Sequence, residues 1–266
     1  MKKIKVGIIG CGTIGAALAR AVEKKFSDKA RVTALCDKHP AKAVLLRAGL
    51  TSKPKICAAA ELVRKSDFVI EAASRDIVGE VARLVERFGR EALVMSVGGL
   101  LEMPIEKLKR GRIWIPSGAV AGIDGVLAAA EAGITKALLI TRKPPEGLLS
   151  APYFKEHAFP KLSGSREVRV FKGSALQAVR AFPQNVNVAA VLSLAGAGAL
   201  KTRVEIWTSK AYRRNLHEIV LESGAGSLRA LIANVPSPEN PKTSALAVHA
   251  AVAVMRKIFS RVRICT

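Results

Sequence analysis

The most constraining feature of this sequence is GCGTIG, residues 10–15, which joins two segments of different periodicity. It follows the β-rich run IKVGIIG and opens TIGAALARAVEKKF, whose apolar residues have helical spacing. Asp37 ends the next strand-like run, 22 residues after Gly15. A bare GxGxxG is a weak motif. Between a strand and a helix, with an acidic residue after the second strand, it is typical of a dinucleotide-binding unit.

Each glycine of this motif has a separate physical task. Gly10 permits a tight turn, Gly12 lets the backbone approach a pyrophosphate, and Gly15 lets the helix pack against the strand. The helix N-terminus adds amide donors and the positive end of its dipole. The predicted cofactor-binding residues of this loop are Gly10, Gly12, Thr13, Ile14 and Gly15.

Asp37 is the residue that bears on the choice of cofactor. Its carboxylate is placed to accept hydrogen bonds from the adenosine ribose hydroxyls, which favours NAD over NADP because a 2′-phosphate would be repelled. Lys38 and His39 follow directly and could neutralise such a phosphate. The sequence therefore predicts NAD or NADP as cofactor and leaves the choice open.

The alternation of strand and helix patterns predicts two domains. Further strand-like runs at 30–37, 67–74 and 90–97 alternate with helical segments, which indicates a parallel sheet. Strand-like runs between 137 and 235, with the turn signal SGAGS, indicate a smaller α+β domain with a mostly antiparallel sheet, backed by helices within 174–200. The predicted boundaries are 1–117 with 239–266 returning to it, and 118–238 for substrate and catalysis.

Composition limits the remaining classes. Lys and Arg number 43 against 21 Asp and Glu, a net charge of +22 that favours anionic partners. The basic residues are spread, without a basic tail, so a solvated positive surface is the simpler interpretation than a nucleic-acid site. The four cysteines lack metal-ligand spacing, which predicts reduced thiols and no metal. No segment reaches the ~20 apolar residues of a membrane span, so we expect a cytoplasmic protein.

Four segments of the second half carry a specific resemblance. They are IPSGAVAGIDGV, FPQNVNVAA, NLHEIVLES and NVPSPENPKTSALAV. In their order and approximate spacing they resemble the L-aspartate dehydrogenase family. The resemblance implies oxidation of L-aspartate with NAD or NADP to iminoaspartate, which can hydrolyse to oxaloacetate and ammonia or supply NAD biosynthesis. It also implies that His217 is catalytic and that Ala121 and Asn187 contact the cofactor.

From the residues alone, His217 has a less specific interpretation. It begins the alternating run LHEIVLES and shares a strand face with Ile219 and Leu221, where a histidine is more often a core residue than a catalyst. With the family resemblance, a catalytic role becomes the favoured interpretation of His217. As a proton-transfer group in oxidation or imine hydrolysis, a neutral imidazole with a pKa near the working pH would be suitable.

Two asparagines precede the apolar helix of FPQNVNVAA. Asn185 can be explained as an N-cap, whereas Asn187, in the first turn, offers an amide donor and acceptor suited to a nicotinamide carboxamide or ribose. Later in the chain, Asn240 as N-cap and Pro241 at the first helical position predict a helix whose first turn could hold a carboxylate; ordinary capping is an equal alternative. The predicted substrate-binding residues are Ser117, Lys242, Thr243 and Ser244.

Two other functions stay open at this point. A reductase of the dihydrodipicolinate reductase type would share GCGTIG, although the paired His and Lys motif usual before its small-residue loop is missing before Ser117. A dinucleotide-sensing regulator that binds nucleic acid would suit the charge, but no helix-turn-helix is evident. A homo-oligomer, a dimer through the antiparallel sheet of the second domain, is also expected.

Overall fold

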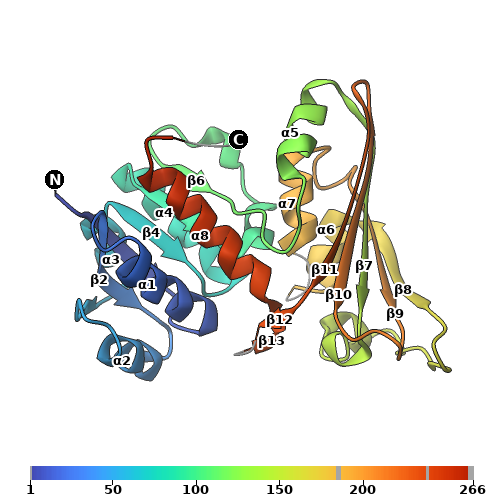
Figure 1. Ribbon diagram of the computed structural model, residues 1–266, viewed down its shortest axis with the longest axis horizontal. Coiled ribbons are helices and arrows are strands. Elements are labelled where there is room, and N and C mark those ends of the chain that lie inside the picture. Colours follow the sequence, from blue (N-terminus) through green and yellow to red (C-terminus); the bar gives the residue numbers. More distant parts are fainter. Residues whose placement is uncertain (1, 184–186, 238–239, 263–266) are drawn as a thin grey trace. The chain divides into compact units, whose positions relative to one another are not determined.

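The structure is a computed structural model that describes residues 2–183, 187–237 and 240–262, with the backbone alone for 236–237 and 240–243. The chain divides into two compact units. The first comprises the described residues of 1–116 and 248–264, and the second those of 117–247. Figure 1 shows the elements of both units. The predicted Asn185 cap and Cys265 lie outside the described residues.

A six-stranded parallel sheet forms the first unit. Its strand order, β3–β2–β1–β4–β5–β6, is that of a doubly wound Rossmann domain, as the motif predicts. The strands are β1 (Ile4–Ile9), β2 (Ala30–Cys36), β3 (Lys55–Ile56), β4 (Phe68–Glu71), β5 (Glu91–Val94) and β6 (Arg112–Trp114). The helices are α1 (Thr13–Lys25), α2 (Pro40–Ala48), α3 (Ala59–Lys65), α4 (Arg75–Phe88) and most of α8 (Ala245–Phe259).

The core of this unit joins segments from both ends of the chain. Strand β1 is buried on both faces, as a central parallel strand should be, and α1 packs on it through residues such as Leu18. Helix α8 adds its own apolar face to the same core, including Met255. The ring of Phe259 meets those of Phe26 and Phe68 edge-on, at 5.3 and 5.9 Å between centroids. Burial of aromatic surface therefore attaches the last helix to the Rossmann unit.

The second unit contains a five-stranded sheet of order β11–β10–β7–β9–β8. Its pairs are antiparallel except β7 with β9, so the sheet is mixed and mostly antiparallel, which confirms the predicted fold class. The strands are β7 (Ile134–Lys143), β8 (Val168–Ser174), β9 (Arg203–Thr208), β10 (Asn215–Ser223) and β11 (Gly226–Asn234), joined by helices α5 (Ile123–Glu131), α6 (Ala175–Ala181) and α7 (Asn187–Ala195).

The helices of the second unit cover one face of its sheet (Figure 1). The close approach of Gly125 to the side chain of Leu228 shows which face this is, because Leu228 pairs with Leu221 and shares its side of the sheet. His217 and Ile219 lie on that same side and are buried. The opposite face has no helix packed on it among the described residues.

The predicted start of the last helix is wrong. Asn240–Ser244 form strand β13, which pairs with β12 (Pro236–Ser237), and α8 begins at Ala245. Ser244 provides the cap: its hydroxyl accepts a hydrogen bond from the Leu246 amide at 3.2 Å. Lys242 and Thr243 therefore precede the helix, and a substrate role for them stays a prediction that no longer rests on a helix N-terminus.

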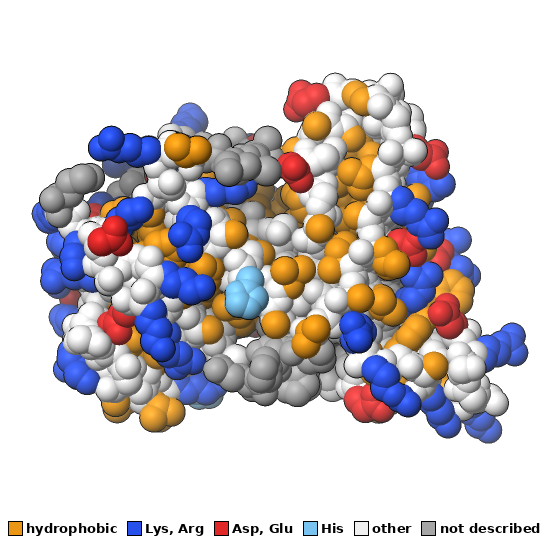
Figure 2. Space-filling model, in the orientation of Figure 1, with side chains coloured by type: hydrophobic (Ala, Val, Ile, Leu, Met, Phe, Trp, Pro, Cys, Tyr) orange, Lys and Arg blue, Asp and Glu red, His pale blue; other side chains and the backbone are white. Residues whose placement is uncertain are grey.

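The positive charge is distributed over both units. Figure 2 shows Lys and Arg side chains scattered over the visible surface of each unit, with fewer Asp and Glu between them. No helix within the described ranges has the length and apolarity to cross a membrane. Among the same residues, no group of three or more His, Cys, Asp or Glu is arranged to hold a metal ion.

Candidate active site

The glycine loop has the shape that a dinucleotide requires. Gly10 has a φ of +93°, in the region that favours glycine, and a Cβ there would meet the backbone of Ala72 at 2.5 Å. At Gly15 a Cβ would overlap the carbonyl oxygen of Gly10. A Cβ at Gly12, in contrast, would meet nothing within 4 Å, so the space beside this residue at the start of α1 is open. The loop thus fits a pyrophosphate at the helix N-terminus.

Asp37 is held against the same loop. One carboxylate oxygen accepts the amide of Cys11 at 2.7 Å, and the other accepts the amide of His39 at 2.8 Å. Each carboxylate oxygen has a further lone pair for a ribose hydroxyl. The thiol of Cys11 is buried, and this burial, followed by the charge of Asp37, raises its pKa to about 12, so Cys11 is inert as a nucleophile.

A second carboxylate organises the neighbouring strand ends. Glu71, at the carboxyl end of β4, is fully buried and accepts hydrogen bonds from the amides of Ala73 and Ser96 at 2.8 and 3.0 Å and from the Ser96 hydroxyl at 2.9 Å. Burial raises the pKa of Glu71. These contacts tie together the loops that follow β4 and β5, at the strand ends where Rossmann sheets bind ligands.

His217 occupies an interior position in the second unit. It lies opposite Thr141 of β7, is 3% exposed, and its Nδ1 is 3.0 Å from the Thr141 hydroxyl oxygen. Burial, with the nearby charge of Lys143, lowers its pKa to about 3. The expectation of a pKa near working pH is therefore wrong, because burial disfavours the imidazolium. At working pH the ring is neutral and is oriented by Thr141.

Lys143 is the residue of this cluster that sequence reasoning missed. It ends β7, two residues after Thr141 on the same face, and is only 4% exposed. Its carbonyl oxygen accepts the Thr208 hydroxyl at 2.9 Å, which attaches it to β9. Burial lowers the pKa of its ammonium group to about 8. The alternation Ala137, Leu139, Thr141, Lys143 was the available signal, because period two places all four on the buried face.

A buried ammonium group should make stability depend on pH. The pKa of Lys143 is about 8 in the folded protein against 10.5 for an ordinary lysine, a difference of about 3 kcal/mol. The folded state carries this cost in full below pH 8 and loses it as pH rises to 10.5, so stability rises through that window. We expect the Lys143→Met variant to lack this rise. The unfolding free energy of wild type minus that of the variant, measured in urea, should therefore increase from pH 7 to 10.5. A constant difference would contradict the assignment.

The loop between β6 and α5 is connected to the start of α8. Asn234, the last residue of β11, donates to the carbonyl oxygen of Ala119 at 2.9 Å and accepts the hydroxyl of Ser244 at 2.7 Å. Ser244 is thus engaged in structural contacts. Ala121 is exposed, Ser117 is half-buried, and Asn187 is the exposed first residue of α7.

The comparisons decide the family of this chain. A family model described as the C-terminal domain of aspartate dehydrogenase matches residues 124–258. L-aspartate dehydrogenase of Methanosarcina acetivorans is 41% identical, over 99% of this chain and 100% of the relative. The chain belongs to the L-aspartate dehydrogenase family. A further relative, L-aspartate dehydrogenase 3 of Bordetella bronchiseptica, is 35% identical over 100% of this chain and 98% of its own length.

The fold agrees with this membership. The crystal structure of an aspartate dehydrogenase from Thermotoga maritima superposes with a TM-score of 0.76 at 22% identity, covering 99% of this chain and 100% of the other. A second family model, the NAD-binding domain of homoserine dehydrogenase, matches residues 10–108, which include GCGTIG and Asp37. This member of the L-aspartate dehydrogenase family is accordingly an oxidoreductase with an NAD(P)-binding Rossmann unit.

In this family member the predicted site residues fall into two sets. The glycine loop and Asp37 are brought together in the first unit, and His217 meets Thr141 in the second. The shared role of Ala121, Asn187 and His217 in one site stays a prediction from the family resemblance.

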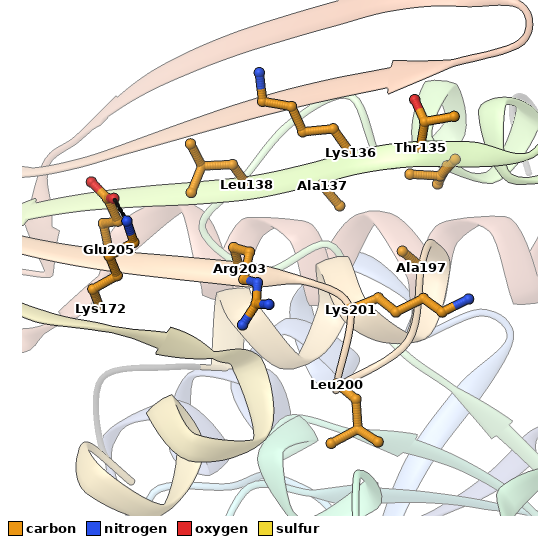
Figure 3. A pocket seen from close by; sticks show the side chains of 11 residues that line it. Thr135, Lys136, Ala137, Leu138, Lys172, Ala197, Leu200, Lys201, Arg203 and Glu205 are labelled. Atoms are coloured by element: carbon orange, nitrogen blue, oxygen red, sulfur yellow. Dashed lines mark ion pairs between the residues drawn. The ribbon is translucent and has the colours of Figure 1, made fainter.

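A hollow of about 500 Å³ in the second unit is separate from the His217 cluster. Figure 3 shows Lys136 of β7, Lys201 and Arg203 among its lining side chains, with Lys172 beside Glu205. These cations are partly neutralised: Lys172 lies 4.0 Å from Glu205, and Lys136 lies 2.7 Å from Glu222. Lys136 is seven residues before Lys143, roughly 23 Å along the strand, so the hollow lies at the other end of β7.

Proposed function

We propose that this chain oxidises L-aspartate with NAD or NADP to iminoaspartate, which can hydrolyse to oxaloacetate and ammonia. The observation that carries the proposal is the 41% identity to an L-aspartate dehydrogenase along 99% of the chain. The open glycine loop supplies space for a dinucleotide, and the buried His217–Thr141 pair supplies polar groups for the substrate. Released iminoaspartate would also be a precursor for NAD biosynthesis.

The proposal divides the work between the units. The first, with Gly10, Gly12, Gly15 and Asp37, binds the dinucleotide, and the second, from Ser117, carries substrate and catalysis. The bound cofactor supplies the hydride acceptor. Ala121 and Asn187 are proposed cofactor contacts, as the family resemblance implies.

His217 acts as a neutral hydrogen-bonding group toward the substrate. Thr141 engages its Nδ1 and sets the ring orientation, while Nε2 has no partner among the described residues and is available to substrate or to the water that hydrolyses the imine. Because the pKa of His217 is about 3, the ring binds and orients without storing a proton.

Initial rates test the reaction directly. Reduction of NAD and NADP is followed at the nicotinamide absorbance with L-aspartate, D-aspartate and a panel of other L-amino acids. We expect turnover selective for L-aspartate, with both cofactors measured because Asp37 favours NAD while Lys38 and His39 are exposed beside it. Measurable NAD binding without turnover of any amino acid would contradict the proposal.

We infer that the working protein is a cytoplasmic homodimer joined through the helix-free face of the second sheet. On this face Leu231 is 64% exposed. It lies opposite Glu218, which accepts hydrogen bonds from Arg142 at 2.8 Å and Arg229 at 2.7 Å. An exposed leucine beside paired charges suits a self-complementary contact. Light scattering should give twice the chain mass for the wild type and the single mass for Leu231→Glu; a monomeric wild type would overturn the inference.

A further inference from the structure

We propose that Lys143 is the general base of this active site, its side-chain nitrogen taking a proton from the α-ammonium group of bound L-aspartate. The inference rests on the proposed oxidation of L-aspartate and adds a residue to it. It begins from the position of Lys143, which shares a sheet face with Thr141 and His217 and is almost entirely buried.

The strand register places Lys143 beside the imidazole. His217 is directly opposite Thr141, so Lys143, two residues further along β7, is its diagonal neighbour, with backbone positions roughly 7–8 Å apart. A lysine side chain spans that distance easily. The effect of the Lys143 charge on His217 agrees with this proximity. The two side chains can therefore act on one substrate molecule.

The surroundings of Lys143 favour a neutral amine. Burial is the cause that lowers its pKa, and His217 is the titratable group that shares its face on β10. Glu218 belongs to the opposite face, where Arg142 and Arg229 pair with it. Helix α7 carries no charged residue. The charged residues of the other covering helices are exposed: Asp124 and Glu131 of α5, and Arg180 of α6.

The chemistry of amine oxidation requires such a base. The α-ammonium group has no lone pair, so it must lose a proton before its nitrogen can form the C=N bond. The Lys143 amine takes that proton and becomes an ammonium group. A bound oxidised nicotinamide would accept the hydride that leaves Cα with the electron pair of the Cα–H bond, and the nitrogen lone pair would then form the iminium bond. Lys143 finally releases its proton to water. His217, held neutral, cannot store this proton at working pH.

Two substitutions separate a base from a simple cation. Lys143→Arg keeps the positive charge but cannot be deprotonated, and Lys143→Met removes the nitrogen. We expect kcat to fall about 100-fold or more in both, with rescue of Lys143→Met by ethylamine in the buffer. Matched controls are Lys136→Arg and Lys136→Met, exposed on the same strand, which should keep wild-type kcat. A Lys143→Arg variant within about threefold of wild type would show that a cation suffices and overturn the proposal.

A measurement on the wild-type protein covers variants that do not fold. If Lys143 is the base, kcat at saturating L-aspartate should fall as pH drops below about 8; a flat kcat from pH 6.5 to 10 would contradict this. Without cofactor or substrate, ¹³C NMR of lysines labelled at Cε should show one resonance titrating near pH 8, and no such resonance would also overturn the proposal. If the wild type does not oxidise L-aspartate at all, the proposed function fails first, and the NMR result still reports on Lys143.

Discussion

Replacement of His217 by alanine is expected to lower kcat for L-aspartate oxidation by about 100- to 1,000-fold, the effect of losing one oriented hydrogen-bonding group, while affinity for NAD changes little. The physical reason is its position. The ring lies in the second unit, buried and oriented by Thr141, whereas the dinucleotide loop belongs to the first. The effect is measured as kcat from initial rates and as the dissociation constant of NADH from its fluorescence.

The control for this variant is His157→Ala. His157 is exposed and stacked on Tyr153 in the same unit, so its loss removes an imidazole without touching the buried face. It should keep wild-type kcat. Since His217→Ala also opens a cavity, its melting temperature must be compared with that of wild type, and His217→Asn offers a smaller loss of volume. Equal losses of turnover and NADH affinity in both His217 variants would argue against a catalytic role.

Substitution of Gly15 by alanine is expected to destabilise the first unit by several kcal/mol or prevent its folding. The added Cβ would overlap the carbonyl oxygen of Gly10, and that residue, at a φ of +93°, is packed against the backbone of Ala72. Because the obstacle is backbone, no side-chain rotation relieves it. Thermal unfolding of the purified variant, or its yield in soluble form, measures the effect.

Gly12→Ala is the matched substitution in the same loop. Its Cβ would meet no protein atom within 4 Å, so the variant should fold with a melting temperature near that of wild type. A methyl group in the space meant for a pyrophosphate should nevertheless raise the KM for NAD about tenfold or more. A Gly12→Ala enzyme with wild-type KM for both cofactors would show that the dinucleotide does not approach this residue.

Much of the first unit could be predicted because its constraints are local. GCGTIG requires a positive φ at Gly10 and close packing at Gly15, and the structure has both. The position of Asp37 at the end of the second strand was predicted equally well, because strand β2 ends at Cys36, one residue before it. What the sequence did not reveal is that Asp37 also accepts two backbone amides, a role that depends on how the loop folds back on it.

The site in the second unit was less predictable because it depends on pairing between distant strands. Lys143 stands before two prolines, in a segment that looks like the exit of a strand. Pairing with β9 extends β7 to include Lys143 and buries its side chain. Burial of His217 itself, followed by the nearby charge of Lys143, lowers the pKa of His217 far below the expected value. The last helix begins at Ala245, after the Ser244 cap, and not at Pro241 as predicted.

Transfer of deuterium from L-aspartate labelled at Cα tests directly whether this chain oxidises L-aspartate by hydride transfer to a nicotinamide. The enzyme is incubated with NAD and the labelled substrate, and the reduced cofactor is isolated and analysed by mass spectrometry. Hydride transfer from Cα predicts one deuterium per reduced nicotinamide formed. Reduced cofactor without deuterium, or none formed at all, would contradict it.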